Sequence, residues 1–191
     1  MHAASLAMTN SMSRELGAVH LVVDGPWLSK ALAATLFART GRSPPQLRVA
    51  ADGKLTASWS RPARRAAGFE LDDSADQAEL LILTARSLSP DVLCETDRRT
   101  ADARPELLAI ADLCWLATRP DRGSLLRAAH WMARQQAARV FGRCRRRVVV
   151  DARDGDRGLP DRTALQIMFR PAAVYIAASV NPVPDWLAAV A

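Results

Sequence analysis

The chain has little cysteine, almost no lysine and no long apolar run, and the shortages of cysteine and apolar length each exclude a class of protein. Its three cysteines, Cys94, Cys114 and Cys144, are an odd number at wide spacing. This argues against a disulfide framework and against a zinc site built from short C-x-x-C pairs. No apolar stretch reaches the roughly 18 residues needed to cross a bilayer. We therefore expect buried free thiols in a cytoplasmic protein without a transmembrane segment.

The termini look different from the rest of the chain. The first 17 residues lack the basic start and the continuous apolar core of a signal peptide. We therefore interpret residues 1–17 as a flexible N-terminal tail and residues 181–191, which carry two prolines, as a C-terminal tail. Residues 18–180 are expected to form one domain, since a hydrophobic share of 49% with 24% charged residues is typical of a globular protein.

The basic residues consist of 24 arginines and only two lysines, Lys30 and Lys54, and the net charge is +6. A positive surplus favours acidic partners such as nucleic acid, anionic lipid or an acidic protein. The densest basic segment ends a predicted helix and enters a predicted strand; its members are Arg139, Arg143, Arg145, Arg146 and Arg147. These cations either stabilise the helix C-terminus through its dipole or contact the phosphates of a nucleic acid.

Short apolar runs alternate with helical stretches along the chain. Strands are predicted at 19–23, 47–51, 91–96, 113–117, 147–150 and 173–177, and helices at 28–40, 72–87, 105–111, 124–141 and 162–169. Residues 54–68 are ambiguous, with 56–59 compatible with a short strand. The alternation predicts an α/β fold, with a mostly parallel, doubly wound sheet and helices on both faces. In such folds ligands bind beyond the carboxyl ends of the strands.

The loop after the first predicted strand aligns with the eight-residue frame of a phosphate-binding loop. The sequence there is DGPWLSKA, from Asp24 to Ala31, and it places Lys30 at the lysine position of that frame. Asp24 and Ser29 stand where glycines are needed, and Ala31 replaces the hydroxyl that binds Mg²⁺. A carboxylate at position 24 would repel a phosphate. Trp27 brings a bulky indole into the same loop. The alternative is an ordinary turn with one solvated lysine.

Several segments, in order, resemble the ParA/MinD-like P-loop NTPase family. The strand VAAD at 49–52, the segment SPDVLCETD at 89–97 and the strand RVVVDARD at 147–154 are each similar to a family motif. The most specific likeness is ADLCWLATRPDRGSLLRAA at 111–129, which is similar to the family's "ADLVLLVTxPDxxSLxAA" over nineteen residues. The resemblance covers roughly residues 19–180 and implies a P-loop NTPase-like fold.

The resemblance also implies roles for single residues. Lys30 and Ser29 would face a nucleotide, Asp52 would lie in a switch region, and Asp97 would lie near the metal; the alternative for both aspartates is a strand-end carboxylate in a turn. The chain departs from the family's two-lysine, glycine-rich loop, and Asp151 replaces the asparagine that recognises the base in many members. ATP with Mg²⁺ is the only cofactor that the resemblance implies, and no catalytic or metal-binding residue is predicted.

The expected function follows from these departures. The chain is expected to be a non-catalytic pseudo-ATPase that acts as a partner or regulatory subunit, in a homo- or heterodimer, in the positioning or assembly of a larger cellular machine. One alternative is a basic α/β nucleic-acid-binding protein, since ParA-type proteins often bind DNA through basic surface residues. A second is a divergent but active ATPase that uses Lys30 and Asp97.

Overall fold

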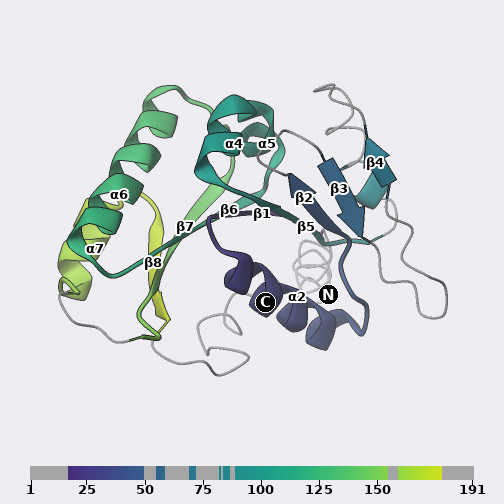
Figure 1. Cartoon of the computed structure of the whole chain (residues 1–191), viewed down its shortest axis with the longest axis horizontal. Coiled ribbons are helices and arrows are strands. Elements are labelled where there is room, and N and C mark those ends of the chain that lie inside the picture. Colours follow the sequence, from purple (N-terminus) through teal and green to yellow (C-terminus); the bar gives the residue numbers. More distant parts are fainter. Residues whose placement is uncertain are drawn as a thin grey trace, which may run out of the picture.

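The computed structural model describes residues 17–49, 55–58, 69–71, 82, 84–86, 89–154 and 159–177. These residues form an α/β fold around one sheet (Figure 1). The elements are β1 (Val19–Val23), α2 (Pro26–Thr40), β2 (Gln46–Val49), β3 (Leu55–Ser58), β4 (Phe69–Leu71), β5 (Val92–Thr96), α4 (Arg98–Ala103), α5 (Pro105–Ile110), β6 (Leu113–Thr118), α6 (Arg122–Ala137), β7 (Arg145–Asp151), α7 (Arg162–Met168) and β8 (Ala173–Ala177). No described helix combines the length and the apolar character required to cross a membrane.

The sheet has the order β4-β3-β2-β5-β1-β6-β7-β8. Six neighbouring strands, β2, β5, β1, β6, β7 and β8, are parallel. Strands β3 and β4 extend the sheet beyond β2 and pair in antiparallel orientation. Numbered along the chain, the parallel strands follow the order 2-3-1-4-5-6, which is a Rossmann- or P-loop-like topology. The central strands β1 and β6 are buried along their whole length, as expected for parallel strands covered on both faces.

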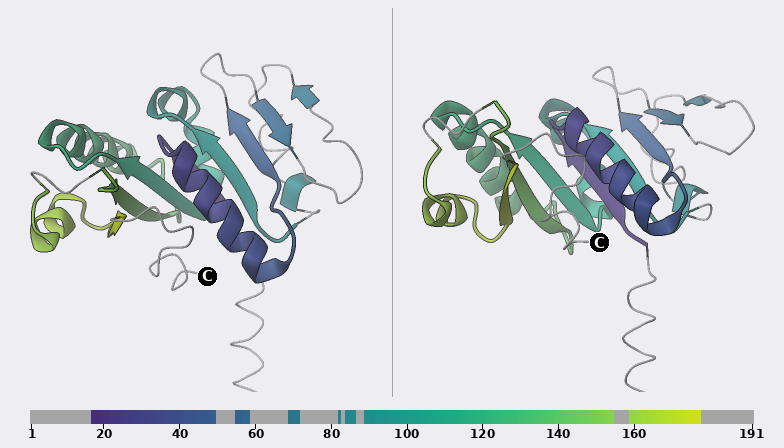
Figure 2. Two further views of the ribbon diagram at one scale, coloured as in Figure 1. Left: turned by 60° about the horizontal axis from the view of Figure 1, so that its bottom comes forward. Right: turned by 90° about the horizontal axis from the view of Figure 1, so that it is seen from below.

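Helices cover the two faces of the sheet unequally. On one face Leu28 and Leu32 of α2 pack against Val22, Leu93 and Trp115. On the other, the larger core includes buried residues of α4, α5, α6 and α7 together with Ile82 and Ala85. Among the described residues α2 is the only helix on its face, and Figure 2 shows it crossing the middle of the sheet. The prediction of a mostly parallel α/β sheet with helices on both faces is confirmed.

Several boundaries differ from the predicted ones. The helix expected at 124–141 ends at Ala137, because Arg139 takes a left-handed conformation with φ 56° and the chain turns there. The short helix α4 follows β5 where no helix was predicted. The ambiguous stretch contributes β3, which pairs with β2. Most of the helix expected at 72–87, and both predicted tails apart from Gly17, lie outside the described residues.

Candidate functional site

The carboxyl edge of the parallel sheet is the place where this fold binds ligands. The turns after β1, β5 and β6 meet there and contain Asp24, Asp97 and Asp121, and β7 ends at the same edge with Asp151. Asp52, expected in a switch region, lies outside the described residues. No three His, Cys, Asp or Glu side chains of the described residues gather closely enough to hold a metal ion.

The turn after β1 contains only two residues, Asp24 and Gly25, before α2 begins at Pro26. Asp24 has a left-handed backbone, with φ 57°, and its N–H donates to the carbonyl of Thr96 at 3.0 Å. Its carboxylate accepts the backbone N–H of Arg98 at 3.1 Å and pairs with the Arg98 guanidinium. Because both residues are largely shielded from solvent, this pair closes the turn against α4.

Gly25 packs closely against the neighbouring strand. A Cβ added at Gly25 would lie 2.8 Å from the Cβ of Ala117, which is closer than such atoms approach in real proteins. The glycine therefore allows α2 to approach β6. This close packing by itself explains why a glycine stands at position 25, the one glycine of the eight-residue frame.

The other residues of that frame lie inside helix α2 rather than in a loop. Ser29 is buried, and Lys30, the fifth residue of the helix, is exposed. Pro26 at the first helical position has no N–H to offer a ligand, and such prolines are common where helices begin. The structure therefore brings Ser29 and Lys30 one turn into α2, and it does not place Lys30 in a glycine-rich cradle.

Trp27 lies against a charged side chain that follows strand β7. The guanidinium of Arg153, just after β7, lies 4.1 Å from the centroid of the Trp27 ring. The same guanidinium donates to both carboxylate oxygens of Asp151, at 2.6 Å and 2.7 Å. These hydrogen bonds hold the pKa of Asp151 below its ordinary value, although burial opposes the shift. Asp151 is thus engaged by a neighbour on its own strand end.

The remaining carboxylates of this edge cap helices. Asp97 accepts the N–H of Thr100 at 2.7 Å and begins α4. Asp121 accepts the N–H of Ser124 at 2.9 Å and begins α6. Both fit the alternative interpretation given above for Asp97, a strand-end carboxylate in a turn, because aspartate is among the preferred N-caps. Asp24, Asp97, Asp121 and Asp151 therefore each already have a partner within the chain.

An open groove of about 380 Å³ lies between α4 and α6, next to this edge. Its lining is cationic and apolar; the residues are Arg98, Leu126, Arg127, His130, Trp131 and Arg134. The carboxylate of Asp102 on α4 binds the two helices together, accepting from Trp131 at 2.8 Å and from Arg134 and Gln135 at 2.5 Å each. Leu126 is 50% exposed, an unusual degree for a large aliphatic side chain beside a cavity. No pattern in the sequence indicates this groove.

The basic segment at 139–147 does not form one continuous face. Arg139 and Arg143 are exposed in the turns after α6. Within β7 the side chains alternate, so that Arg146 lies over the Phe141 ring at 5.2 Å while Arg147 lies on the α2 face of the sheet, 4.8 Å from the Trp115 ring. Adjacent arginines of a strand point to opposite faces, which is a poor arrangement for contacting one phosphate backbone.

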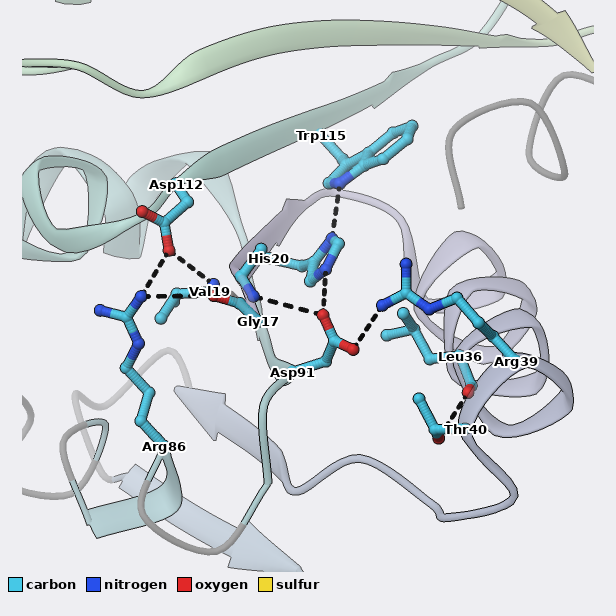
Figure 3. Close-up of polar contacts among 11 residues, drawn as sticks. Gly17, Val19, His20, Leu36, Arg39, Thr40, Arg86, Asp91, Asp112 and Trp115 are labelled. Carbon is cyan, nitrogen blue, oxygen red and sulfur yellow. Dashed lines mark hydrogen bonds and ion pairs between the residues drawn. The ribbon is translucent and has the colours of Figure 1, made fainter. Parts of the chain in front are cut away.

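A buried polar network lies on the α2 face, at the opposite end of the sheet from Asp24, and sequence reasoning missed it (Figure 3). Asp91 is 3% exposed and accepts from Arg39 of α2 at 2.5 Å and from the N–H of Ala18 at 3.2 Å. The His20 Nε2 lies 3.5 Å from the same carboxylate, and the indole N–H of Trp115 donates to His20 Nδ1 at 3.3 Å. Burial alone would raise the pKa of Asp91, but the hydrogen bonds from His20 and Arg39 outweigh it and lower the pKa to about 2.

The start of β1 is fastened by a second carboxylate. Asp112, just before β6, accepts the N–H of Val19 at 2.9 Å and pairs with Arg86 at 3.1 Å (Figure 3). Asp91 and Asp112 therefore bind consecutive backbone amides at the point where the described chain enters the sheet. Both arrangements hold β1 in place, and neither presents an open group to a ligand.

The three cysteines are free and buried, as predicted. Burial raises the pKa of Cys94 and of Cys144 to about 12, and it raises the pKa of Cys114 well above its ordinary value. Thiols of this kind carry almost no thiolate at neutral pH and are poor nucleophiles. The cysteines therefore belong to the core and not to a reactive site.

No protein-family model matches this chain, and no curated protein matches it in sequence.

Proposed function

We propose that this chain is a non-catalytic, ParA/MinD-like protein that works through contact with another protein, as a partner or regulatory subunit in positioning or assembling a larger cellular machine. The observation that carries the proposal is the closed pair between Asp24 and Arg98 at the head of α2. It holds the Asp24 carboxylate, already paired with a guanidinium, where a nucleotide-binding relative would hold phosphates.

The backbone at this turn supports the same proposal. A phosphate-binding loop wraps several backbone N–H groups around the anion and adds a lysine. Here the connection from β1 to α2 is two residues long, its glycine packs on Ala117, and the first helical residue is a proline. A phosphate would meet one carboxylate and few free donors, so binding of ATP is strongly disfavoured.

The groove between α4 and α6 supports contact with a partner. It joins a half-exposed leucine, Leu126, to the guanidinium groups of Arg127 and Arg134 and to exposed His130. An apolar anchor surrounded by arginines is a common composition for protein interfaces. The partner segment that fits is acidic and carries at least one apolar side chain, which would lie on Leu126.

Affinity purification from the native host, without added nucleotide, tests the proposal. The unmodified chain and a Leu126→Glu/Arg127→Glu variant are compared, with Ile167→Glu as the matched control, because Ile167 is also exposed but lies on α7. We expect one partner in near-stoichiometric amount with the unmodified chain and the control, and at least a tenfold loss with the double variant. Recovery of no stoichiometric partner would overturn the proposed function.

A further inference from the structure

A second cavity lies at the opposite edge of the sheet from Asp24, at the amino ends of β7 and β8. It has a volume of about 320 Å³, near the lower end of the usual range for small-molecule sites. Its lining comes from the start of β7 and the residue before it, Cys144, Arg145, Arg146 and Arg147, and from the start of β8 and the turn before it, Pro171, Ala173 and Tyr175. The cavity therefore has a cationic side and a mainly apolar side.

Arg147 is the central residue of this cavity. It pairs in register with Trp115 of β6 and with Ala173 of β8, so its side chain shares their face. Its guanidinium lies 4.8 Å from the Trp115 ring and 5.8 Å from the Tyr175 ring, and it donates to the Tyr175 hydroxyl at 3.3 Å. The two rings hold the guanidinium in one orientation, and a fixed guanidinium suits the geometry of an oxyanion.

The charge of Arg147 is not neutralised by a carboxylate among the described residues. Six other arginines have a carboxylate oxygen within 4 Å: Arg39, Arg48, Arg86, Arg98, Arg134 and Arg153. None of the arginines from 139 to 147 has one in the part of the chain that the structure describes. Burial lowers the pKa of Arg147; Tyr175 opposes the shift, and Arg145 adds to it. A half-buried cation without a counter-charge is costly, and a bound anion would remove that cost.

The shape and surroundings of the cavity decide which anion fits. A membrane surface requires exposed apolar side chains beside the cations, but among the described residues the large exposed hydrophobic side chains are Phe37, Leu126 and Ile167, on α2, α6 and α7. A nucleic-acid strand requires cations along one face, whereas Arg146 points away from Arg147. The cavity is instead a recess with the guanidinium of Arg147 in its lining.

We propose that this cavity binds a small phosphomonoester of about the size of a nucleoside monophosphate, with its phosphate on Arg145 and Arg147 and its organic part along Pro171 and Ala173. The register of β7 places Arg145 and Arg147 on the same face of the sheet, two residues apart, so that both guanidinium groups reach one phosphate. The site does not involve Lys30 or the carboxyl edge.

Isothermal titration calorimetry at low ionic strength tests the proposal with inorganic phosphate, AMP, adenosine and a single-stranded oligonucleotide. We expect saturable one-to-one binding of AMP, weaker binding of phosphate and none of adenosine. Arg147→Gln and Arg145→Gln should each weaken AMP binding at least about tenfold. Arg162→Gln, an exposed arginine on α7, is the control and should leave it unchanged. Because Arg145 is exposed, its variant tests the site even if Arg147→Gln fails to fold.

Three results would overturn the proposal: no saturable binding of AMP or phosphate, AMP binding that both Arg145→Gln and Arg147→Gln retain, or binding of the oligonucleotide alone. The Lys30→Ala variant separates this site from the carboxyl edge. AMP binding that is lost in Lys30→Ala and kept in Arg147→Gln would contradict both this proposal and the proposed function. Failure to bind AMP at all would leave the proposed function intact.

Discussion

Asp24 and Arg98 are 74 positions apart, yet the carboxylate of the first accepts both the backbone N–H and the guanidinium of the second. The pair joins the turn after β1 to the start of α4, across the ends of two adjacent strands. It occupies the point at which this topology ordinarily receives a ligand.

Two replacements of Asp24 should distinguish how much its ion pair contributes to stability from how much its left-handed backbone costs. Asp24→Ala removes the pair and keeps a side chain at φ 57°, so we expect the free energy of unfolding to fall by about 2 kcal/mol. Asp24→Gly removes the pair but adopts this conformation freely, and it should be roughly 1 kcal/mol more stable than Asp24→Ala. Urea denaturation measures both values. Two variants as stable as the unmodified chain would show that the pair contributes nothing.

Substitution of Gly25 should disturb the contact between α2 and β6. The new methyl group of Gly25→Ala would lie 2.8 Å from the Cβ of Ala117, and such overpacking costs about 1–3 kcal/mol. The double variant Gly25→Ala/Ala117→Gly removes the opposing methyl group, so its loss should be smaller than the sum of the two single losses. Additive losses in thermal or urea unfolding would contradict the close contact.

The buried carboxylate of Asp91 should give the protein a distinct acid sensitivity. Its pKa in the folded protein is about 2, below the ordinary 3.8. The carboxylate therefore contributes stability above pH 3.8, and this contribution is lost as the pH falls toward 2. Asp91→Asn should lower the free energy of unfolding at neutral pH by about 1–3 kcal/mol and flatten its dependence on pH in this window. Asp154→Asn, at an exposed position, is the control and should keep the acid dependence of the unmodified chain.

The cysteines should resist thiol reagents until the protein unfolds. Burial raises the pKa of Cys94 and Cys144 to about 12 and that of Cys114 well above 9.0. Iodoacetamide at a pH of about 8 should therefore leave the native protein unmodified. Mass spectrometry should find all three cysteines labelled after denaturation in guanidinium chloride. Rapid labelling of one cysteine in the native protein would show that its burial has been assigned wrongly.

The elements that could be predicted from sequence are those with a strong apolar pattern. β1 is apolar except for His20 and β6 begins with a continuous apolar run, and both were expected within one residue of their observed bounds. α4 was missed because its sequence, RRTADA, has no apolar periodicity, and the helix depends on the Asp97 cap and on Asp102, which anchors it to α6. Local pattern cannot predict a helix that tertiary contacts hold in place.

The sequence predicted where the candidate site lies, but not which residues pair with one another there. The sequence placed Asp24 and Lys30 after the first strand, but it could not show that Asp24 pairs with Arg98, because no local signal links residues so far apart. The helix after this strand was predicted at 28–40, and it begins two residues earlier, at Pro26. The same limit applies to His20 and Asp91, which are 71 positions apart in the chain and in contact in the core.

Titration of the chain with ATP and Mg²⁺, with Lys30→Ala as the paired variant, tests whether the carboxyl edge of the sheet binds a nucleotide. We predict no saturable binding there up to roughly 1 mM nucleotide. Any ATP that binds should be lost in Arg147→Gln and kept in Lys30→Ala. Saturable binding in the micromolar range that Lys30→Ala abolishes would contradict the account, since it would show that the Asp24–Arg98 pair opens to admit a nucleotide.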